Sequence, residues 1–478
     1  MIFTSFDFAL FFALIVIARI CLGRFTAEKW LLLGASLVFY ISWSVPCVAL
    51  IFLTSLLDWS IARKLGHTAD ARARKRLLVT SLVVSLGLLG FFKYGNFILE
   101  NVGALLNVLG ANVGSLRYNV VLPPAISFYT FASMGYVLDV YYERIPICAS
   151  ARDYTLFITF FPKLLSGPIV RAGELLPQFK ERARATAEDV EIGLSYGLMG
   201  AVKKLVIADQ VAPQVALTFC APAQYDALSL LMGVLGYTVQ IYCDFSGYSD
   251  MAIGVARILG FRLPENFQMP LSATSITDFW RRWHITLSKW FRDYLFLPLE
   301  MATRANPSPT LRISINILVM MLLVGLWHGP SWNYVVFGGI HGLALVIHKI
   351  WTTWDPIRSK KKQRVFQPVW KCAAHLLTLG VVLVGFVFFR AATFSGATVF
   401  LKRLLTWESS GTRVSSPQIL AAVAAVLLVH LVVGKDRNLA LEMPQKSMTV
   451  RVLGYASLVL LLTLLGATNA SPFIYFQF

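Results

Sequence analysis

The uncharged run ISINILVMMLLVGLW occupies residues 313–327, and HGPSW follows it directly at residues 328–332. A run this apolar is typical of a helix that crosses a lipid bilayer, where every backbone polar group must be satisfied within the segment. The pair Gly329–Pro330 ends the helix, because glycine favours a helix terminus and proline cannot continue one. We therefore expect a membrane helix that stops abruptly at His328.

The composition of the whole chain is that of a membrane protein. Of its 478 residues, 57% are hydrophobic and only 14% are charged, and the mean hydropathy is +0.65. A soluble core cannot bury so much apolar surface. By the criterion of about 20 residues for a spanning helix, the apolar runs counted together with spans of mixed composition predict about ten to thirteen membrane segments. The other apolar runs are Asp7–Leu22, Trp30–Trp43, Leu77–Phe92, Val369–Phe389, Ile419–Val433 and Val452–Leu465. We expect one all-α, multi-pass membrane domain over residues 1–478.

The net charge of +18 does not indicate a nucleic-acid partner. Nucleic-acid binding needs an accessible basic face, whereas the basic residues of this chain lie between hydrophobic runs. The excess of Lys and Arg in cytoplasmic loops of membrane proteins explains them better. Six scattered cysteines form no CxxC pair and the histidines form no HExxH motif, so we expect neither disulfides nor a metal site.

Residues 155–180, TLFITFFPKLLSGPIVRAGELLPQFK, contain a hydrophobic run that prolines and glycines interrupt. Proline removes a backbone donor and clashes with the preceding turn, so a straight spanning helix is unfavourable here. We expect a broken or re-entrant element, which is tolerated at membrane depth only inside protein or beside water. Lys163 and Arg171 either line a path for an anionic substrate or mark the cytoplasmic side.

Two carboxylates, Asp244 and Asp250, lie near or within an apolar span. Charged groups inside a membrane are costly, so we expect them to be paired or to line a polar cavity. Arg257 lies about two helical turns after Asp250 and is expected to share its helix face. The pair would fix helix packing; proton transfer by Asp244 is the functional alternative.

The stretch WRRWHITLSKWFRDY, residues 280–294, has the periodicity of an amphipathic helix. One side carries large apolar residues and the other carries charged ones. The apolar side comprises Trp280, Trp283, Leu287, Trp290, Phe291 and Tyr294, and the charged side comprises Arg282, Lys289, Arg292 and Asp293. We expect a helix that lies in the membrane interface. His284 falls at the edge of the aromatic side, where it would face the protein interior.

His328 is the strongest single candidate for chemistry. An imidazole is well matched to proton transfer near neutral pH, and an ionisable group at the end of a membrane span is a functional hypothesis. The alternative is an interfacial histidine whose nitrogens are satisfied by water. His341, in the small-residue motif GGIHG, is a candidate for supporting the site.

Seven motifs, distributed over essentially the whole chain, carry a resemblance to a known family. They are FFKYGNF (91–97), LPPAISFYTF (122–131), FFPKLLSGPIVR (160–171), YCDFSGYSDMAIG (242–254), FWRRWHITLSKWFRDYLFLPL (279–299), LWHGPSWNYVVFGGIHG (326–342) and FIYFQF (473–478). With these motifs the chain resembles the membrane-bound O-acyltransferase (MBOAT) superfamily, and within it the bacterial branch that takes part in alginate O-acetylation.

The resemblance implies a helical bundle with re-entrant and interfacial helices around a tunnel, or a pair of funnels, near a catalytic histidine. It implies that His328 is the essential residue and His284 its companion. It also implies a multi-pass protein of the bacterial inner membrane, surrounded by lipid, with no tightly bound cofactor. The acyl group would come from a cytosolic thioester, acetyl-CoA in this branch, and would pass outward to a hydroxyl of an exported polysaccharide. A periplasmic SGNH-type acetyltransferase would complete the transfer.

Ester formation needs a base for the hydroxyl proton, which we assign to His328, and a group that orients or polarises the reactants, which we assign to His284. Peptidoglycan or teichoic-acid acylation is an alternative function. A transporter or flippase with Asp244 and Asp250 in its pathway is another, although the chain shows no inverted repeat. The two histidines can meet only if the interfacial helix folds in beneath the apolar span.

Overall fold

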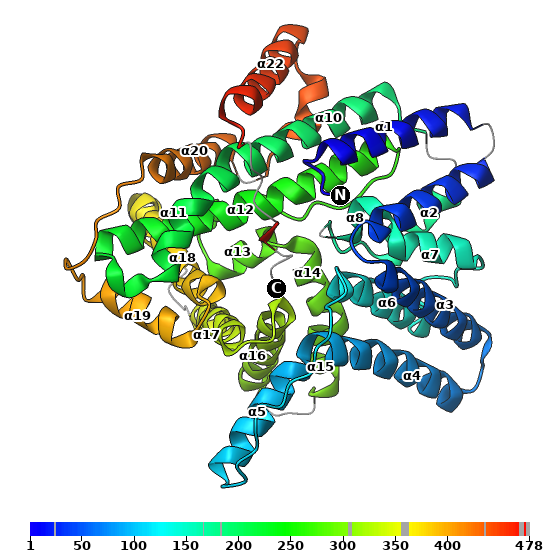
Figure 1. Cartoon of the computed structure of the whole chain (residues 1–478), viewed down its shortest axis with the longest axis horizontal. Coiled ribbons are helices and arrows are strands. Elements are labelled where there is room, and N and C mark those ends of the chain that lie inside the picture. The colour runs from blue at the N-terminus through cyan, green and yellow to red at the C-terminus, as the bar shows by residue number, and fades with distance from the viewer. Residues whose placement is uncertain are drawn as a thin grey trace. The chain divides into compact units, whose positions relative to one another are not determined.

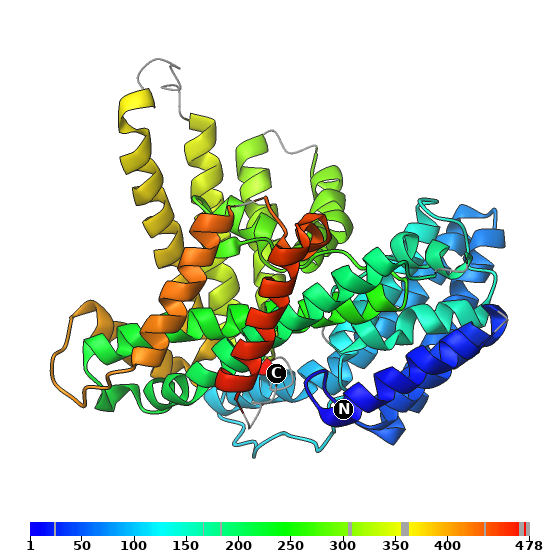
Figure 2. The same cartoon turned by 90° about the horizontal axis from the view of Figure 1, so that it is seen from above.

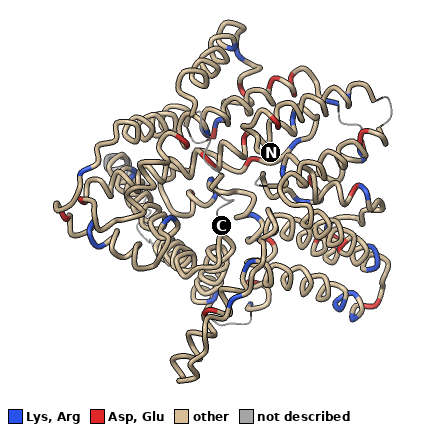
Figure 3. The backbone as a smooth tube through the Cα atoms, viewed as in Figure 1, with Lys and Arg blue, Asp and Glu red and all other residues tan. Residues whose placement is uncertain are grey.

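The computed structural model describes residues 1–22, 25–165, 167–181, 184–304, 308–354, 363–434, 436–467 and 473–474 (Figure 1). Within these ranges every regular element is a helix, apart from one isolated bridge between Tyr225 and Thr412. The prediction of an all-α fold is confirmed. Most of the trace in Figure 3 carries no charge, as a lipid-facing protein requires.

Seven helices of the described residues are long and apolar enough to cross a membrane. They are Val45–His67, Ala71–Val108, Ala227–Ile258, Pro309–His328, Trp332–Thr353, Pro368–Arg390 and Met448–Leu465. The predicted ten to thirteen segments exceed this number. The runs at the two ends of the chain form shorter helices, α1 (Phe6–Cys21), α2 (Phe25–Ile41) and α20 (Pro417–Val433). These have 16, 17 and 17 residues, at the lower end of the range of about 17–25 residues for spanning helices.

The chain forms two compact units. Unit 1 comprises residues 1–194 and 252–264, and unit 2 comprises residues 195–251 and 265–478. The expectation of a single domain over residues 1–478 stays a prediction.

Unit 1 is built on four helices that pack together: α3 (Val45–His67), α4 (Ala71–Leu89), α6 (Ile126–Tyr141) and α7 (Ala151–Thr159). A buried carboxylate joins three of them. Asp58 on α3 accepts hydrogen bonds from Ser81 on α4 and Ser133 on α6, and Ser133 also bonds to the Tyr154 hydroxyl on α7. A buried carboxylate must have such partners. The helix α4 continues through the π-helical turn η1 (Gly90–Tyr94) into α5 (Gly95–Val108).

The broken element predicted over residues 155–180 is confirmed in unit 1. It comprises α7, α8 (Phe161–Leu164), α9 (Ala172–Leu175) and the 3₁₀ turn η2 (Pro177–Phe179). Lys163 is only 6% exposed and its Nζ lies 4.6 Å from the centre of the Phe157 ring. Burial lowers the pKa of Lys163 to about 7. Lys163 therefore lies inside unit 1 and not at an exposed membrane edge.

Unit 2 contains three consecutive helices that pack side by side: α16 (Pro309–His328), α17 (Trp332–Trp354) and α18 (Gln363–Arg390). Two glycines let α16 and α17 approach closely. A Cβ at Gly325 would lie 2.1 Å from the Tyr334 carbonyl oxygen, and one at Gly338 would lie 2.3 Å from that of Met321. Figure 2 shows that the start of α16, the end of α17 and the start of α18 lie at the same end of this unit.

A second layer of unit 2 comes from two long helical stretches. The first is α10 (Ala187–Ala201), which continues through the π-helical segment η3 (Val202–Ala208) into α11 (Asp209–Cys220). The second is α12 (Ala227–Ile258). The parts of both stretches that belong to unit 2 are joined by buried ion pairs. Helices α19 (Phe394–Leu405), α20 and α22 (Met448–Leu465) pack on this layer.

Candidate active site

The prediction of one continuous helix over residues 280–294 is wrong, because the helix is interrupted at His284. Helix α13 (Ile276–Arg282) ends at Trp283, and α14 (Ile285–Phe291) begins after His284. His284 itself has φ 42° and ψ 55°, the left-handed region that costs an ordinary side chain about 1–3 kcal/mol and clusters at functional sites. After α14 the chain continues through the π-helical turn η6 (Arg292–Phe296) into α15 (Leu297–Ala302).

Asn266 accounts for the break. Its carbonyl oxygen accepts a hydrogen bond from the Ile285 amide at 2.9 Å, and its side-chain Oδ1 accepts from the Thr286 hydroxyl at 2.8 Å and the Thr286 amide at 3.3 Å. The first turn of α14 is therefore tied to another part of the chain. Helical periodicity cannot reveal this, because Asn266 lies 18 residues before His284.

The burial predicted for this stretch is confirmed. Five of the six predicted apolar-side residues are buried, and Tyr294 is half-buried. The five are Trp280, Trp283, Leu287, Trp290 and Phe291. Lys289 and Arg292 are exposed, and His284 is 1% exposed. The apolar side chains reach the interior although one helix has become two, and His284 faces inward as expected.

The surroundings of His284 fix its protonation. Its Nδ1 lies 3.1 Å from Asn266 Oδ1, which can only accept, so Nδ1 carries the hydrogen and Nε2 carries the lone pair. The Asn266 amide is oriented by its other end, which donates to the Ser249 hydroxyl at 3.3 Å. Burial lowers the pKa of His284 to about 3, so the imidazole is neutral at pH 7.

His328 is the last residue of α16, and Gly329 caps the helix, as the sequence predicts. Its ring is 3% exposed and packs among aromatic rings. The ring centres of Trp327, Phe389 and Phe337 lie 4.9, 4.9 and 5.8 Å from that of His328.

The structure brings both histidines to the same indole. The centre of the Trp327 ring lies 5.6 Å from that of His284 and 4.9 Å from that of His328. The approach predicted for two residues that are 44 positions apart (328 − 284) is therefore observed. The catalytic roles of the two histidines remain proposals.

His341 supports this arrangement from α17. The Trp280 indole donates to His341 Nδ1 at 3.3 Å, and the Thr277 hydroxyl bonds to His348 Nδ1 at 3.0 Å. Helix α13 is thus attached to α17 at two levels. The Phe337 ring lies between His341 and His328, with centre distances of 4.6 and 5.8 Å.

The predicted pairing of Asp250 with Arg257 is wrong. Asp250 pairs with Lys203 at 2.6 Å, and in unit 1 Arg257 pairs with Asp189 at 2.9 Å. Asp244 pairs with Lys204, also at 2.6 Å. The expectation that both carboxylates are paired is confirmed, but their partners come from the neighbouring helix and not from α12 itself.

Sequence reasoning missed Lys203 and Lys204. The signal that could have found them is two adjacent lysines in an otherwise uncharged stretch, GLMGAVKKLVIA (197–208). They lie in the π-helical segment η3, and such segments are frequent at functional sites. The two side chains reach carboxylates that are six residues apart on α12, about 9 Å along the helix axis.

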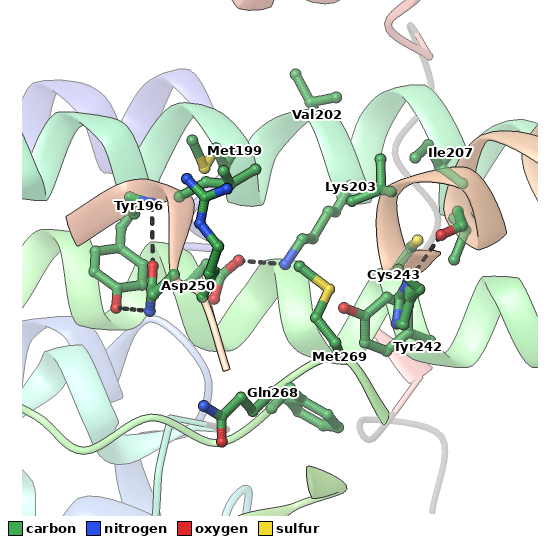
Figure 4. Close-up of a pocket in the computed structure, with 18 of the residues that line it drawn as sticks. Tyr196, Met199, Val202, Lys203, Ile207, Tyr242, Cys243, Asp250, Gln268 and Met269 are labelled. Atoms are coloured by element: carbon green, nitrogen blue, oxygen red, sulfur yellow. Dashed lines mark hydrogen bonds and ion pairs between the residues drawn. The ribbon is translucent and has the colours of Figure 1, made fainter. Parts of the chain in front are cut away.

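Lys203 borders a cavity of about 270 Å³, here the Lys203 cavity. Figure 4 shows the Lys203 ammonium and the Asp250 carboxylate pointing toward each other, with Tyr242, Gln268 and Met269 nearby. At its polar end Asn438 donates to the Tyr196 hydroxyl at 2.7 Å, and Tyr196 donates to Glu265 at 3.3 Å. The apolar lining includes Val202, Ile207, Val426, Val429 and Leu458.

One aromatic side chain separates the Lys203 cavity from His284. Phe267 lines the cavity, and its ring stacks on the His284 ring with a centre distance of 6.3 Å and an angle of 28°. Tyr242 and Trp283 hold Phe267 from its sides, at 6.1 and 5.1 Å.

Lys204 borders a second cavity, of about 250 Å³, here the Lys204 cavity. Its polar lining consists of Lys204, Asp209, Gln240, Asp244 and Arg390. Two of its lining residues are sequence neighbours of aromatic residues that contact the histidines. Asp244 precedes Phe245, whose ring lies 4.7 Å from that of His284, and Arg390 follows Phe389, which packs on His328.

Within the described part of the chain, no three His, Cys, Asp or Glu side chains lie close enough together to hold a metal ion. All six cysteines are free.

A model of the membrane-bound O-acyltransferase family matches residues 142–378, which include both histidines. "Probable alginate O-acetylase AlgI" of Pseudomonas putida is 34% identical over 100% of this chain and 100% of that protein. The protein of the same name in Azotobacter vinelandii is 36% identical over 82% of this chain and 75% of that protein. The chain belongs to the membrane-bound O-acyltransferase family.

The resemblance seen in the motifs is thereby confirmed, including its branch. "Peptidoglycan O-acetyltransferase" of Helicobacter pylori is 34% identical over 79% of this chain and 73% of that protein. Family membership and these relatives make the chain a multi-pass membrane enzyme, an O-acetyltransferase of the MBOAT family. An acyl donor and a polysaccharide acceptor are implied. The transporter alternative has lost its basis.

Proposed function

We propose that this enzyme transfers an acetyl group from cytosolic acetyl-CoA to hydroxyls of an exported polysaccharide at the bacterial inner membrane. The single observation that carries the proposal is the placement of His284 and His328 on one indole, beside two cavities of different character. The names of the relatives support the acetyl group and the polysaccharide.

The charge of the loops gives the orientation of unit 2. The sequence between α17 and α18 contains Arg358, Lys360, Lys361 and Lys362, and Arg364 follows at the start of α18. Arg304 precedes the start of α16, and Arg312 follows it. The turns at the opposite ends of these helices, residues 329–331 and 391–393, carry no charge. Since basic residues stay in the cytoplasm, His328 lies at the outer end of α16.

The position of the Lys203 cavity supports its assignment to the donor. Arg390 at the outer end of α18 lies over the Phe219 ring at the end of α11, and Asp226 before α12 bonds to Thr412 before α20. The starts of α12 and α20 therefore lie at the outer side, and the residues after α20 lie at the cytoplasmic side. Arg437 and Asn438 belong to those residues and line the Lys203 cavity. A thioester that enters there reaches Phe267 and, behind it, His284.

The position of the Lys204 cavity supports its assignment to the acceptor. Arg390 puts it at the outer end of α18, the end at which His328 lies. Its lining of two cations, two carboxylates and an amide offers many hydrogen-bond partners without a net charge, which suits the hydroxyls of a carbohydrate.

The chemistry then needs one proton transfer. The oxygen of the acceptor hydroxyl attacks the thioester carbonyl while His328 takes the hydroxyl proton. The C–S bond then breaks, and His328 passes the proton to the departing thiolate. His284 is neutral and presents the lone pair of Nε2, so it orients the acceptor by accepting a hydrogen bond from a second hydroxyl of the carbohydrate, while the attacking hydroxyl gives its proton to His328. This favours the orienting role of His284 over the polarising one. A periplasmic SGNH-type acetyltransferase would receive the acetyl group when the polysaccharide is modified outside the membrane.

The test is acetyl transfer from radiolabelled acetyl-CoA by the purified protein in detergent, with mass spectrometry of the envelope polysaccharides from cells with and without it. Loss of polysaccharide acetylation in the deletion strain and label transfer in vitro are expected. Unchanged acetylation in the deletion strain would overturn the proposal. Peptidoglycan is the second candidate acceptor, because a relative of 34% identity carries that name, and the same mass spectra distinguish it.

A further inference from the structure

The C-terminal motif FIYFQF has no part in the chemistry described so far, yet its first two residues lie in the interior of unit 2. Phe473 is 2% exposed and Ile474 is 5% exposed. Burying a segment costs conformational entropy and needs partners for its backbone groups. The contacts of these two residues therefore show what the segment does.

The backbone of Ile474 is bound by a buried carboxylate. Its amide donates to Asp244 Oδ2 at 2.8 Å. The other oxygen of Asp244 pairs with Lys204 at 2.6 Å, and Lys204 pairs with Asp209 at 2.9 Å. Each of these three side chains is at most 6% exposed. The backbone of Ile474 is thus bound to the ion-pair group that lines the Lys204 cavity, and Ile474 forms one of the walls of that cavity.

The side chain of Phe473 packs on α12 next to His284. Its ring stacks on Tyr248, with a centre distance of 4.4 Å and an angle of 28°, and lies 5.9 Å from the ring of Phe245. The Phe245 ring meets the His284 ring at 4.7 Å and 88°, an edge-to-face contact. One side chain, Phe245, therefore separates the C-terminal segment from His284.

His284 needs support from this side. Its backbone is in the strained left-handed region, and Asn266 holds its Nδ1. Aromatic rings also orient the His284 ring: the centre of Phe245 lies 4.7 Å away, that of Trp327 5.6 Å and that of Phe267 6.3 Å. Without Phe473, space opens behind Phe245, and the Phe245 and His284 rings can shift together.

We propose that Phe473 and Ile474 are positioning residues for acyl transfer: Phe473 holds Phe245 against His284, and Ile474 closes the Lys204 cavity over Asp244. This rests on the orienting role of His284 in the proposed function. Phe473 touches neither donor nor acceptor, so it acts through Phe245. A C-terminal segment that is remote in sequence from both histidines then belongs to the catalytic apparatus.

The experiment replaces Phe473 in the full-length protein and measures kcat and KM for acetyl-CoA separately. Phe473→Ala is expected to lower kcat about 10- to 100-fold, because a displacement of about 1 Å at a catalytic group has this effect, while KM for acetyl-CoA stays within about twofold. Phe473→Leu refills most of the space and should restore most of kcat.

Phe400→Ala is the matched control. Phe400 is also a buried phenylalanine of unit 2, 1% exposed and stacked on Phe219 at 4.6 Å. Among the ring contacts of the described residues, none joins Phe400 to His284, His328 or Phe245. Phe400→Ala should leave kcat within about threefold when both variants purify as folded protein. Equal losses of kcat in Phe473→Ala and Phe400→Ala, or no rescue by Phe473→Leu, would overturn the proposal.

A double-mutant cycle with His284→Ala separates this inference from the proposed function. If Phe473 acts through His284, Phe473→Ala lowers kcat little further in the His284→Ala background. The same fold-loss in both backgrounds would show that Phe473 acts elsewhere and would sink the inference alone. A His284→Ala variant with normal kcat would instead refute the role of His284 in the proposed function, and the inference with it.

Discussion

His284 and His328 reach the same indole from opposite kinds of local structure. His328 ends a regular apolar helix and is capped by the glycine that follows it. His284 has a left-handed backbone conformation and lies between two seven-residue helices, α13 and α14. Asn266 binds the first turn of α14. The conformation at His328 follows from local sequence, whereas the conformation at His284 depends on hydrogen bonds with residues that are distant in sequence. We therefore expect acetyl transfer to depend on the His328 side chain itself. For His284, we expect it to depend also on the residues that hold the His284 ring.

The largest effect is expected for His328→Ala. Removal of a general base costs about 10²- to 10⁴-fold in rate, so acetyl transfer should fall to the limit of detection while the protein still inserts and purifies. Steady-state transfer from labelled acetyl-CoA measures this. Activity near that of the wild type would remove His328 from the role of base.

Asn266→Ala tests the supported half of the comparison. It removes the side-chain partner of His284 Nδ1 and of Thr286, so kcat should fall about 10- to 100-fold through misplacement of the ring. Asn333→Ala is the control, because Asn333 is a buried asparagine that bonds to the Ala391 carbonyl and not to His284. A kcat as high as that of the control would mean that the break at His284 needs no support from Asn266.

The two cavities extend the comparison from residues to substrates. Val429→Phe narrows the Lys203 cavity and Ala212→Phe narrows the Lys204 cavity. We expect the first to raise KM for acetyl-CoA and the second to raise KM for the acceptor, each about 10-fold, because lost contacts of about 1.4 kcal/mol have this effect. Initial-rate kinetics with either substrate varied will show it. The reverse pattern would exchange the roles of the cavities.

The smallest effect is a pH dependence of stability. Since burial lowers the pKa of His284 to about 3, below its ordinary value of 6.5, the unfolded chain binds this proton first as the pH falls. The contribution of His284 to stability is thus complete above pH 6.5 and decreases between 6.5 and about 3. His284→Asn, which tolerates the left-handed backbone, should show a smaller fall in melting temperature between pH 7 and pH 4. An unchanged fall would mean that other groups carry the acid sensitivity.

Several predictions from the sequence rested on local rules and were confirmed. The end of α16 at His328 follows from Gly329–Pro330, and the broken element over residues 155–180 follows from its prolines. The burial of the aromatic side of residues 280–294 follows from its apolar pattern. The predicted number of spans stays a prediction: seven helices of the described residues have the length and composition of a spanning helix, and hydropathy does not register where a helix ends within an apolar run.

The partners of polar residues were predicted poorly. Arg257 was assigned to Asp250 because both lie on α12, but side chains on another helix are equally available once helices pack, and Lys203 took that place. The continuous helix through His284 failed for the same reason. Helix propensity and periodicity describe neighbours along the chain and not the distant Asn266, which accepts hydrogen bonds from the backbone amides of Ile285 and Thr286.

The sequence by itself determined that the chain is an all-helical membrane protein, that an imidazole stands at the end of an apolar span, and which family the motifs belong to. Those features depend on the transfer of apolar residues into lipid and on helix-ending residues, which act within a few positions of themselves. Only the tertiary structure decided the break at His284, the two lysine–aspartate pairs and the insertion of Phe473 and Ile474 beside Phe245. Each of these is a choice of partner between residues far apart in sequence, and the choice depends on how the helices pack.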